Sequence, residues 1–290
     1  MTQSVLKLGY VGLGNMGAPM AQRLVDWPDG VTVFDLRAEA MAPLVEAGAR
    51  AADSLADIAA ADLISVTVLD DAQVRDVVAA IAPKARPGTI IAIHSTISDA
   101  TAVELAQHWS PQNIHIIDAP VSGGAPGAHR GELATMVGAD DEIFERVKEP
   151  FSKWASLVIH AGRPGAGTRM KLARNLLHFV AFTAAGEAQR LAESCGLDIT
   201  ALGKVVRHTD AITGGPGAIM LRDTTDPVTS DSFWLPIFTH VRGLGEKDLS
   251  LALALGEEKS VELPMAALAR ERLAASLGVP HTVPHEQGAS

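Results

Sequence analysis

Short apolar runs alternate with alanine-rich stretches along roughly the first 160 residues of the chain. The apolar runs are four to six residues long and rich in β-branched side chains, which is typical of strands covered by helices on both faces. Strands that alternate with helices indicate βαβ units and a parallel sheet, and short connections favour consecutive strands lying side by side. We expect strands at residues 6–11, 31–34, 63–68, 89–93, 114–118 and 133–137, with helices at 19–25, 38–47, 72–81 and 100–108.

The hydrophobic pattern changes near Lys171. No convincing strand-like alternation follows Ile159, and the remaining sequence is typical of helices separated by glycine or proline. One long helix is predicted from about Thr168 to Cys195, because Gly196 then provides a suitable helix stop. This helix is long enough to bridge two domains, and its mostly apolar surface predicts burial nearly all round.

A polar stripe interrupts this apolar helix. Lys171, Arg174, Asn175 and His178 stand at positions i, i+3, i+4 and i+7, so their side chains share one helix face. An ammonium group such as that of Lys171 can move the proton that hydride transfer requires, if its pKa falls from about 10.4. Asn175 would then position the lysine or the reacting hydroxyl, whereas we interpret Arg174 and His178 as solvated or in interdomain contacts. The alternative for Lys171 is an ordinary solvated charge.

The domain organisation follows from length and pattern together. A chain of 290 residues suits two domains of about 100 to 200 residues each. The run 162–167, which holds three glycines and one proline, is the expected boundary. We predict an α/β fold, in which a Rossmann-type, mostly parallel sheet is followed by an all-helical C-terminal domain, joined through a long interdomain helix. The predicted domains are 1–163 and 164–279, with 280–290 as a loose tail.

Composition and charge narrow the function classes. The net charge is −10, which makes nucleic acid and anionic membrane surfaces poor partners. Cys195 is the single cysteine, so the chain can build neither an internal disulfide nor a thiolate zinc site, and we expect no metal. The first nine residues lack a secretory signal, and the sequence has no run of about 18 apolar residues. We therefore expect a cytoplasmic protein.

A glycine-rich loop follows the first predicted strand and opens a helix, which is the context of a dinucleotide-binding motif. Gly12 allows the tight turn, Gly14 lets the backbone approach a pyrophosphate, and Gly17 permits close packing of helix on strand. The alternative is a plain glycine turn. The candidate cofactor loop is Gly12, Leu13, Gly14, Asn15, Met16 and Gly17.

An acidic residue stands at the end of the second predicted strand. Asp35 follows Gly12 by 23 residues, where a carboxylate can accept hydrogen bonds from both adenosine ribose hydroxyls. Because this carboxylate would repel a 2′-phosphate, we expect NAD to be preferred over NADP. Arg37 complicates this prediction, since it could stack on adenine, reach a 2′-phosphate or simply face solvent.

A second glycine loop, DAPVSGGAPGA at Asp118 to Ala128, begins where the fifth predicted strand ends. Ligands of open α/β sheets bind outside the carboxyl ends of the strands. Ser122, Gly123 and Gly124 offer a hydroxyl and two unobstructed backbone N–H groups, a cradle that suits a carboxylate. The alternative is a tight surface loop without a ligand.

These motifs together resemble the β-hydroxyacid dehydrogenase family, which includes 3-hydroxyisobutyrate dehydrogenase. GYVGLGNMGAPMA (Gly9 to Ala21) resembles its cofactor motif, and DAPVSGGAPGA its substrate motif. GAGTRMKLARN (Gly165 to Asn175) is similar to the segment with the catalytic lysine and asparagine, and KDL (Lys247 to Leu249) to its C-terminal signature. The four motifs occur in the family's order and cover most of the chain.

The resemblance implies a role for each matching residue. Lys171 would be the acid/base assisted by Asn175, and Ser122, Gly123 and Gly124 would hold the substrate. Thr96, in the segment His94 to Thr96, would contact the nicotinamide and the substrate. Further cofactor contacts implied are Val68, Leu69 and Asp70 in the loop after the third predicted strand, and Lys247, with Asp248 near the substrate.

One position departs from the family pattern. Members often carry a phenylalanine seven residues before the KDL lysine, where this chain has His240. His240 could hydrogen-bond a polar substrate or face solvent, and a shifted alignment would place Phe233, Trp234 or Phe238 there instead. This departure falls on the far wall of the expected substrate pocket and leaves the cofactor motifs unchanged.

We interpret the chain as an NAD-dependent oxidoreductase that oxidises a small 3-hydroxy acid to its aldehyde or keto acid, or catalyses the reverse reduction. A homodimer or homotetramer is expected. The alternatives are an imine or semialdehyde reductase of the same architecture and a cofactor-binding regulatory protein without activity. Lys171 disfavours an imine reductase, since those relatives usually carry aspartate or tyrosine there, and the helical part is too short for a 6-phosphogluconate dehydrogenase.

Overall fold

The computed structural model describes residues 5–280, so the predicted tail from 281 onward lies outside the described residues. The chain divides into two compact units, of which the first ends at Arg174 and the second begins at Asn175. The first unit is an α/β layered structure and the second is helical, as the sequence predicts. Within the described residues, no helix combines the length and the apolar character needed to cross a membrane.

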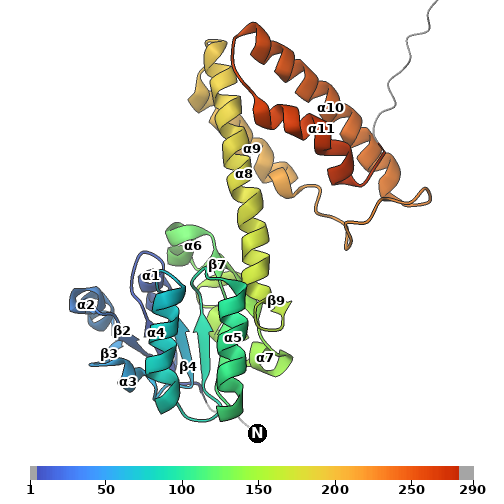
Figure 1. Cartoon of the computed structure of the whole chain (residues 1–290). Coiled ribbons are helices and arrows are strands. Elements are labelled where there is room, and N and C mark those ends of the chain that lie inside the picture. The colour runs from blue at the N-terminus through green and yellow to red at the C-terminus, as the bar shows by residue number, and fades with distance from the viewer. Residues whose placement is uncertain (1–4, 281–290) are drawn as a thin grey trace, which may run out of the picture. The chain divides into compact units, whose positions relative to one another are not determined.

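A twisted sheet with six parallel strands organises the first unit (Figure 1). Its order is β3-β2-β1-β4-β5-β6, the order of a doubly wound dinucleotide-binding sheet. β1 lies centrally, because Leu8 is in register with Val31 on one side and with Leu63 on the other. The predicted strands at 31–34 and 63–68 are therefore not neighbours, and the expectation that consecutive strands pair is wrong at this point. The parallel strands are β1 (Leu8–Val11), β2 (Val31–Phe34), β3 (Arg50–Ala51), β4 (Leu63–Val66), β5 (Ile90–Ile93) and β6 (His115–Asp118).

The sheet continues beyond β6 with strands of mixed direction. β8 (Leu133–Gly138) is antiparallel to β6, with Asp118 opposite Gly138. β7 (Val121–Ser122) is antiparallel to β8, and β9 (Ala155–Gly162) runs parallel to it. The sequence predicted β8 but neither β7 nor β9, since β7 is only two residues long and β9 lacks a strongly apolar pattern.

Helices cover both faces of this sheet, and each face has its own hydrophobic core. Neighbouring strand residues point to opposite faces, so Tyr10 packs with Trp154 and Met20 in one core while Val11 packs with Val78 in the other. The helices of the first unit are α1 (Gly17–Gln22), α2 (Ala38–Glu46), α3 (Leu55–Ile58), α4 (Asp71–Ile81), α5 (Asp99–Trp109), α6 (Gly124–Arg130) and α7 (Asp141–Phe151), with 3₁₀ turns at Ala82–Lys84 and Ser110–Gln112.

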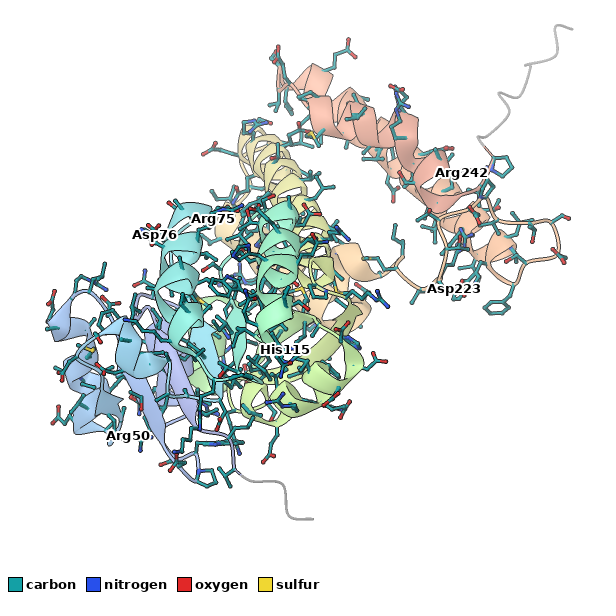
Figure 2. All side chains as sticks on the ribbon, turned by 60° about the horizontal axis from the view of Figure 1, so that its bottom comes forward. Arg50, Arg75, Asp76, His115, Asp223 and Arg242 are labelled. Carbon is teal, nitrogen blue, oxygen red and sulfur yellow. The ribbon has the colours of Figure 1, made fainter. Side chains whose placement is uncertain are left out.

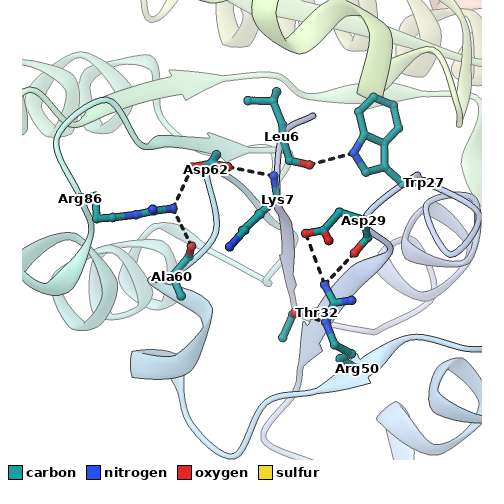
Figure 3. A network of polar contacts seen from close by, with 9 residues as sticks. All are labelled: Leu6, Lys7, Trp27, Asp29, Thr32, Arg50, Ala60, Asp62 and Arg86. Atoms are coloured by element: carbon teal, nitrogen blue, oxygen red, sulfur yellow. Dashed lines mark hydrogen bonds and ion pairs between the residues drawn. The ribbon is translucent and has the colours of Figure 1, made fainter. Parts of the chain in front are cut away.

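Polar contacts hold elements together at two places in this unit. On α4, Arg75 donates to both carboxylate oxygens of Glu104 on α5, at 3.1 and 2.8 Å, so these helices are side by side (Figure 2). At the amino ends of the strands, Asp62 accepts hydrogen bonds from the Lys7 backbone at 2.9 Å and from Arg86 at 2.9 Å (Figure 3). This second network ties the chain before β1 to the chain before β4.

The second unit consists of helices. α8 (Ala166–Ser194) starts in the first unit and continues into the second, followed by α9 (Ile199–Thr213), a 3₁₀ turn (Gly215–Gly217), α10 (Trp234–Glu258) and α11 (Pro264–Leu277). Phe238 of α10 is buried with Leu277 and Val279. The buried carboxylate of Glu187 accepts the backbone N–H groups of Met265 and Ala266 at 2.7 and 3.0 Å. An acidic group at a helix start is favourable, so Glu187 fixes α11 against α8.

The apolar surface of α8 differs from its prediction. The sequence predicted burial nearly all round, but Leu176 is 70% exposed and Phe179 is 59% exposed in the chain. Burial nearly all round is therefore wrong for the single chain. The physical reason is that the chain by itself provides too few partner helices to cover a helix that is apolar on most sides.

Candidate active site

The glycine loop after β1 has the geometry of a pyrophosphate-binding turn. Gly12 has φ +89°, and a Cβ there would lie 2.1 Å from the Thr67 carbonyl oxygen. A Cβ at Gly17 would lie 1.9 Å from the Gly12 carbonyl oxygen, whereas one at Gly14 would meet nothing within 4 Å. The first and third glycines are thus required by packing, and the second leaves open space beside the backbone. This is the arrangement that a dinucleotide pyrophosphate needs, so these residues fit the cofactor.

Asp35 stands where β2 ends and braces the glycine loop. One carboxylate oxygen accepts the Leu13 backbone N–H at 2.7 Å, and the other accepts the Arg37 backbone N–H at 2.9 Å and Nε at 3.3 Å. Burial raises the pKa of Asp35, but the hydrogen bonds from Arg37 and Leu13 outweigh this effect and hold it below the usual value. Asp35 is therefore an anion at neutral pH, beside the guanidinium of Arg37.

The loops after β4 and β5 are joined by a serine to which the sequence assigned no separate role. Ser95 Oγ donates to the Val68 carbonyl at 2.7 Å and accepts the Val68 N–H at 2.9 Å. Asp70 accepts the Gln73 N–H at 2.9 Å and caps α4, so part of its role is structural. Leu69 is 82% exposed, and Thr96 is exposed next to Ser95. The sequence could not show these two hydrogen bonds of the Ser95 side chain, because Val68 and Ser95 become neighbours only when the two loops pack together.

His94 is a core residue of the strand ends. Its Nδ1 lies 2.8 Å from the Ala119 carbonyl oxygen, which can only accept, so Nδ1 carries the proton. Nε2 then accepts the Ser65 hydroxyl at 3.0 Å. Burial lowers the pKa of His94 to about 4, although the hydrogen bond to Ala119 opposes the change. The ring is neutral and links β4, β5 and the chain after β6.

Lys171 lies against the second glycine loop. Its Nζ donates to the Val121 carbonyl oxygen at 2.7 Å and lies 2.8 Å from Ser122 Oγ. Gly123 has φ +128°, and a Cβ there would approach the Leu133 side chain to 2.8 Å, so the loop requires glycine. Gly124 follows at φ +65° and begins α6. Although Lys171 and Ser122 are 49 residues apart, the fold places their functional groups in direct contact.

Burial changes the acidity of this lysine. Lys171 is only 8% exposed, and desolvation, together with the positive charge of Arg174, lowers its pKa to about 8. A lysine with this pKa exists in both protonation states near neutral pH, which suits a group that takes up or releases a proton. The solvated-lysine alternative does not fit a side chain that is buried and held by two oxygen atoms.

The remaining candidates belong to the second unit. Asn175 follows Lys171 by one turn of α8 and begins that unit. His240, Lys247 and Asp248 are all on α10, where each of them is exposed. Their spacing of seven and eight residues puts them on one helix face, and Lys247 Nζ lies 3.2 Å from an Asp248 carboxylate oxygen.

In the first unit, the fold brings the candidates to one edge of the sheet. The loops after β1, β2, β4, β5 and β6 all follow carboxyl ends of parallel strands, where ligands of doubly wound sheets bind. Sequence reasoning missed Asp118, the first residue of the DAPVSGG loop, because a buried acid in a motif gives no signal of which groups it contacts. Its carboxylate accepts two backbone N–H groups at the start of α8.

Two family models match the chain. The model described as the NAD binding domain of 6-phosphogluconate dehydrogenase matches residues 7–162. The model described as NAD-binding of NADP-dependent 3-hydroxyisobutyrate dehydrogenase matches residues 165–279. Together they account for nearly the whole chain and agree with the order of an α/β part followed by a helical part.

Known proteins are similar over the same length. An uncharacterized oxidoreductase of Mycobacterium tuberculosis is 68% identical over 95% of this chain and 94% of its own. A 2-(hydroxymethyl)glutarate dehydrogenase of Eubacterium barkeri is 33% identical over 92% of this chain and 87% of its own. The 3-hydroxyisobutyrate dehydrogenase of Pseudomonas aeruginosa is 32% identical over 91% and 89%. A Streptomyces aurantiacus imine reductase, 16% identical with a TM-score of 0.73 over 94% and 95% of the two chains, shares the fold alone.

The fold and the site define an NAD(P)-binding oxidoreductase with a Rossmann domain followed by a helical domain. The chain belongs to the β-hydroxyacid dehydrogenase family, the group of NAD(P)-dependent oxidoreductases that contains 3-hydroxyisobutyrate dehydrogenase. The resemblance recognised in the four sequence motifs is thereby confirmed.

Proposed function

We propose that the protein uses NAD to oxidise the hydroxyl of a small 3-hydroxy acid to the corresponding aldehyde or keto acid, or catalyses the reverse reduction. The observation that carries the proposal is Lys171, a buried lysine with a pKa lowered to about 8 and its Nζ 2.8 Å from Ser122 Oγ. Two relatives support the substrate class, because 3-hydroxyisobutyrate and 2-(hydroxymethyl)glutarate both carry a hydroxymethyl group on the carbon next to a carboxylate.

Each residue at the site has a chemical task in this proposal. The Ser122 hydroxyl and the backbone N–H groups of Gly123 and Gly124 bind the substrate carboxylate. Neutral Lys171 accepts the hydroxyl proton at Nζ during oxidation, and protonated Lys171 returns it during reduction. Asn175 orients the lysine or the reacting hydroxyl. The nicotinamide, when bound, supplies the hydride acceptor.

The cofactor preference rests on Asp35. Its carboxylate is ionised at neutral pH and accepts the loop N–H of Leu13, so it stands where a 2′-phosphate would meet a negative charge. Arg37 pairs with the same carboxylate at 3.3 Å, which reduces the charge available to attract a phosphate. This arrangement favours NAD over NADP. The Val68 to Asp70 loop, Thr96 and Lys247 complete the proposed cofactor contacts.

Two alternative functions make different demands on this site. An imine or semialdehyde reductase would use the same architecture, and an imine reductase shares the fold. A regulatory protein would bind cofactor without turnover. The buried Lys171 disfavours the regulatory protein, because a protein that needs no proton transfer gains nothing from keeping a lysine partly desolvated. It also disfavours an imine reductase, since those relatives usually carry aspartate or tyrosine at this position.

The apolar side chains of α8 support an assembly of identical chains. Leu176, Phe179 and Phe182 are more than half exposed in the chain, and large exposed apolar patches mark interaction surfaces. A second copy of the chain would bury them in a homodimer or homotetramer.

The single cysteine and the acidic composition fit a cytoplasmic protein.

Activity measurements with the Lys171→Ala variant test the proposal. NAD and NADP reduction should be followed for wild type and variant with 3-hydroxyisobutyrate, 2-(hydroxymethyl)glutarate and L-serine at mildly alkaline pH. We expect turnover with NAD, and a fall in kcat of about 100- to 10,000-fold in the variant with NAD binding retained. Tight NAD binding without turnover of any hydroxy acid would overturn the proposal in favour of an imine reductase or a regulatory protein.

A further inference from the structure

The carboxylate of Asp118 spans the first turn of α8. Oδ1 accepts the Gly165 backbone N–H at 2.7 Å, and Oδ2 accepts the Thr168 backbone N–H at 2.6 Å. The first N–H groups of a helix lack partners within the helix, so this distant acid serves as its cap. Asp118 is only 1% exposed, and burial raises its pKa against the opposing effect of these hydrogen bonds. The bonds are short and enclosed, which makes the position of the helix start sensitive to this side chain.

Two glycines allow the helix to approach the sheet this closely. A Cβ at Gly138 would lie 2.2 Å from Asp118 Oδ1, and a Cβ at Gly167 would lie 2.3 Å from the Met136 carbonyl oxygen. These contacts are with backbone or with a fixed carboxylate, so a larger residue could be accommodated only if the helix moved. We call Asp118, Gly138, Gly165, Gly167 and Thr168 the α8 seat.

The α8 seat and the Lys171 contacts attach two successive turns of α8 to the same segment, residues 118–122. Gly167 and Lys171 are four residues apart, so both face the sheet edge from the same side of α8. Asp118 holds the first turn, while Val121 and Ser122, a few residues further along the same segment, hold Lys171 Nζ in the next turn. A shift at the first contact therefore displaces the second.

We infer that Asp118 is a positioning residue of the reaction: by capping α8 at Gly165 and Thr168 it sets the place of Lys171 Nζ at the substrate loop. This inference rests on the proposed function of Lys171. Asp118 does not need to touch substrate or cofactor for this role. A loss of its second acceptor oxygen frees one end of the first helix turn, and displacements of about 1 Å can lower a rate by about 100-fold.

The test compares Asp118→Asn with a matched control at the opposite edge of the sheet. Asp118→Asn keeps the shape but places an amide N–H₂ against a backbone N–H. The control is Asp62→Asn. The Asp62 carboxylate also accepts a backbone N–H, that of Lys7, and the variant changes it in the same way. We calculate kcat from the concentration of sites that bind NAD, so that misfolded protein does not count. We expect this kcat to fall about 10- to 100-fold in Asp118→Asn, with KM for NAD within twofold of wild type. Asp62→Asn should keep kcat within twofold.

A double variant distinguishes positioning from a general loss of structure. If Asp118 acts through Lys171, Asp118→Asn should lower the residual kcat of Lys171→Ala by less than twofold. An equal loss on both backgrounds, or an unchanged kcat in Asp118→Asn, overturns the inference. A wild-type kcat in Lys171→Ala instead overturns the proposed function, so the two failures differ. Should Asp118→Asn not fold, Asp118→Ser retains one acceptor oxygen and takes its place in the same comparison.

Discussion

The side-chain nitrogen of Lys171 lies 2.8 Å from the hydroxyl oxygen of Ser122. When Lys171 is protonated, it donates to Ser122 and to the Val121 carbonyl. When it is neutral, its two N–H hydrogens can still donate to both oxygens, which leaves its lone pair free for the substrate hydroxyl. Both protonation states therefore keep two hydrogen bonds. The site can lose and regain a proton without leaving a buried polar group unsatisfied, and this is the property that a reversible acid/base needs.

The rate should depend on pH through Lys171. Because its pKa is lowered to about 8, the neutral amine, which is the proposed base, becomes the main form above that pH. We expect kcat/KM for hydroxy acid oxidation to rise about tenfold per pH unit below 8 and to level off above it. The reverse reduction needs the protonated amine, so its rate should fall above pH 8. Initial rates in both directions over pH 6 to 10 measure this, and a flat profile in both would contradict it.

Asp35 should control the choice of cofactor. Asp35→Asn removes the charge that repels a 2′-phosphate and weakens the bonds to the ribose hydroxyls. We expect kcat/KM to fall about tenfold with NAD and to rise with NADP. The tenfold loss corresponds to a hydrogen bond to a charged group, which contributes about 1.5 kcal/mol or more. Arg37→Ala is the control, since it keeps the acid and removes its partner. A wild-type protein that already prefers NADP would show that this prediction is wrong.

Acid should destabilise the first unit through His94. Its folded pKa of about 4 lies below the unfolded value of about 6.5, so the unfolded chain binds the extra proton between these pH values. The contribution of His94 to the free energy of unfolding should thus be complete above pH 6.5. It should decrease as the pH falls towards 4, by up to about 3 kcal/mol. Half-buried His115 adds to the same trend, because burial lowers its pKa too.

Urea unfolding at pH 7.0 and 4.5, followed by tryptophan fluorescence, measures the effect of His94. The comparison with His94→Gln isolates this residue, since glutamine keeps a donor and an acceptor but does not titrate. We expect the variant to lose less stability between the two pH values. Equal losses in both proteins would assign the acid sensitivity to other groups.

The exposed apolar face of α8 should hold identical chains together. Leu176→Asp places a charge on a side chain that is 70% exposed in the single chain, so folding should tolerate it and association should not. Light scattering after size exclusion should give a multiple of 30.3 kDa for wild type and a monomer for the variant. Leu157→Asp, at a 51% exposed position on β9, is the matched control. A monomeric wild-type protein would refute the proposed assembly.

Local signals predicted the first unit well. The six predicted strands coincide with β1, β2, β4, β5, β6 and β8, because short apolar runs between turn residues specify buried strands almost independently of context. The glycine loop was equally readable, since Gly12 and Gly17 are required by backbone contacts of the turn itself. The sequence did not predict β7 and α3, because a segment of two to four residues is too short to show a hydrophobic period.

The sequence by itself determined the alternation of strands and helices and the cofactor loop, since each depends on groups close together in the chain. It also singled out Lys171 as the candidate for proton transfer, through a motif of neighbouring residues. Only the tertiary structure decided what surrounds Lys171. Its contacts with Val121 and Ser122 and the cap that Asp118 forms on α8 join residues 47 to 50 positions apart, and its low pKa comes mainly from the burial that this packing produces. Desolvation and hydrogen bonding depend on which atoms are within a few ångströms, and packing alone sets those distances.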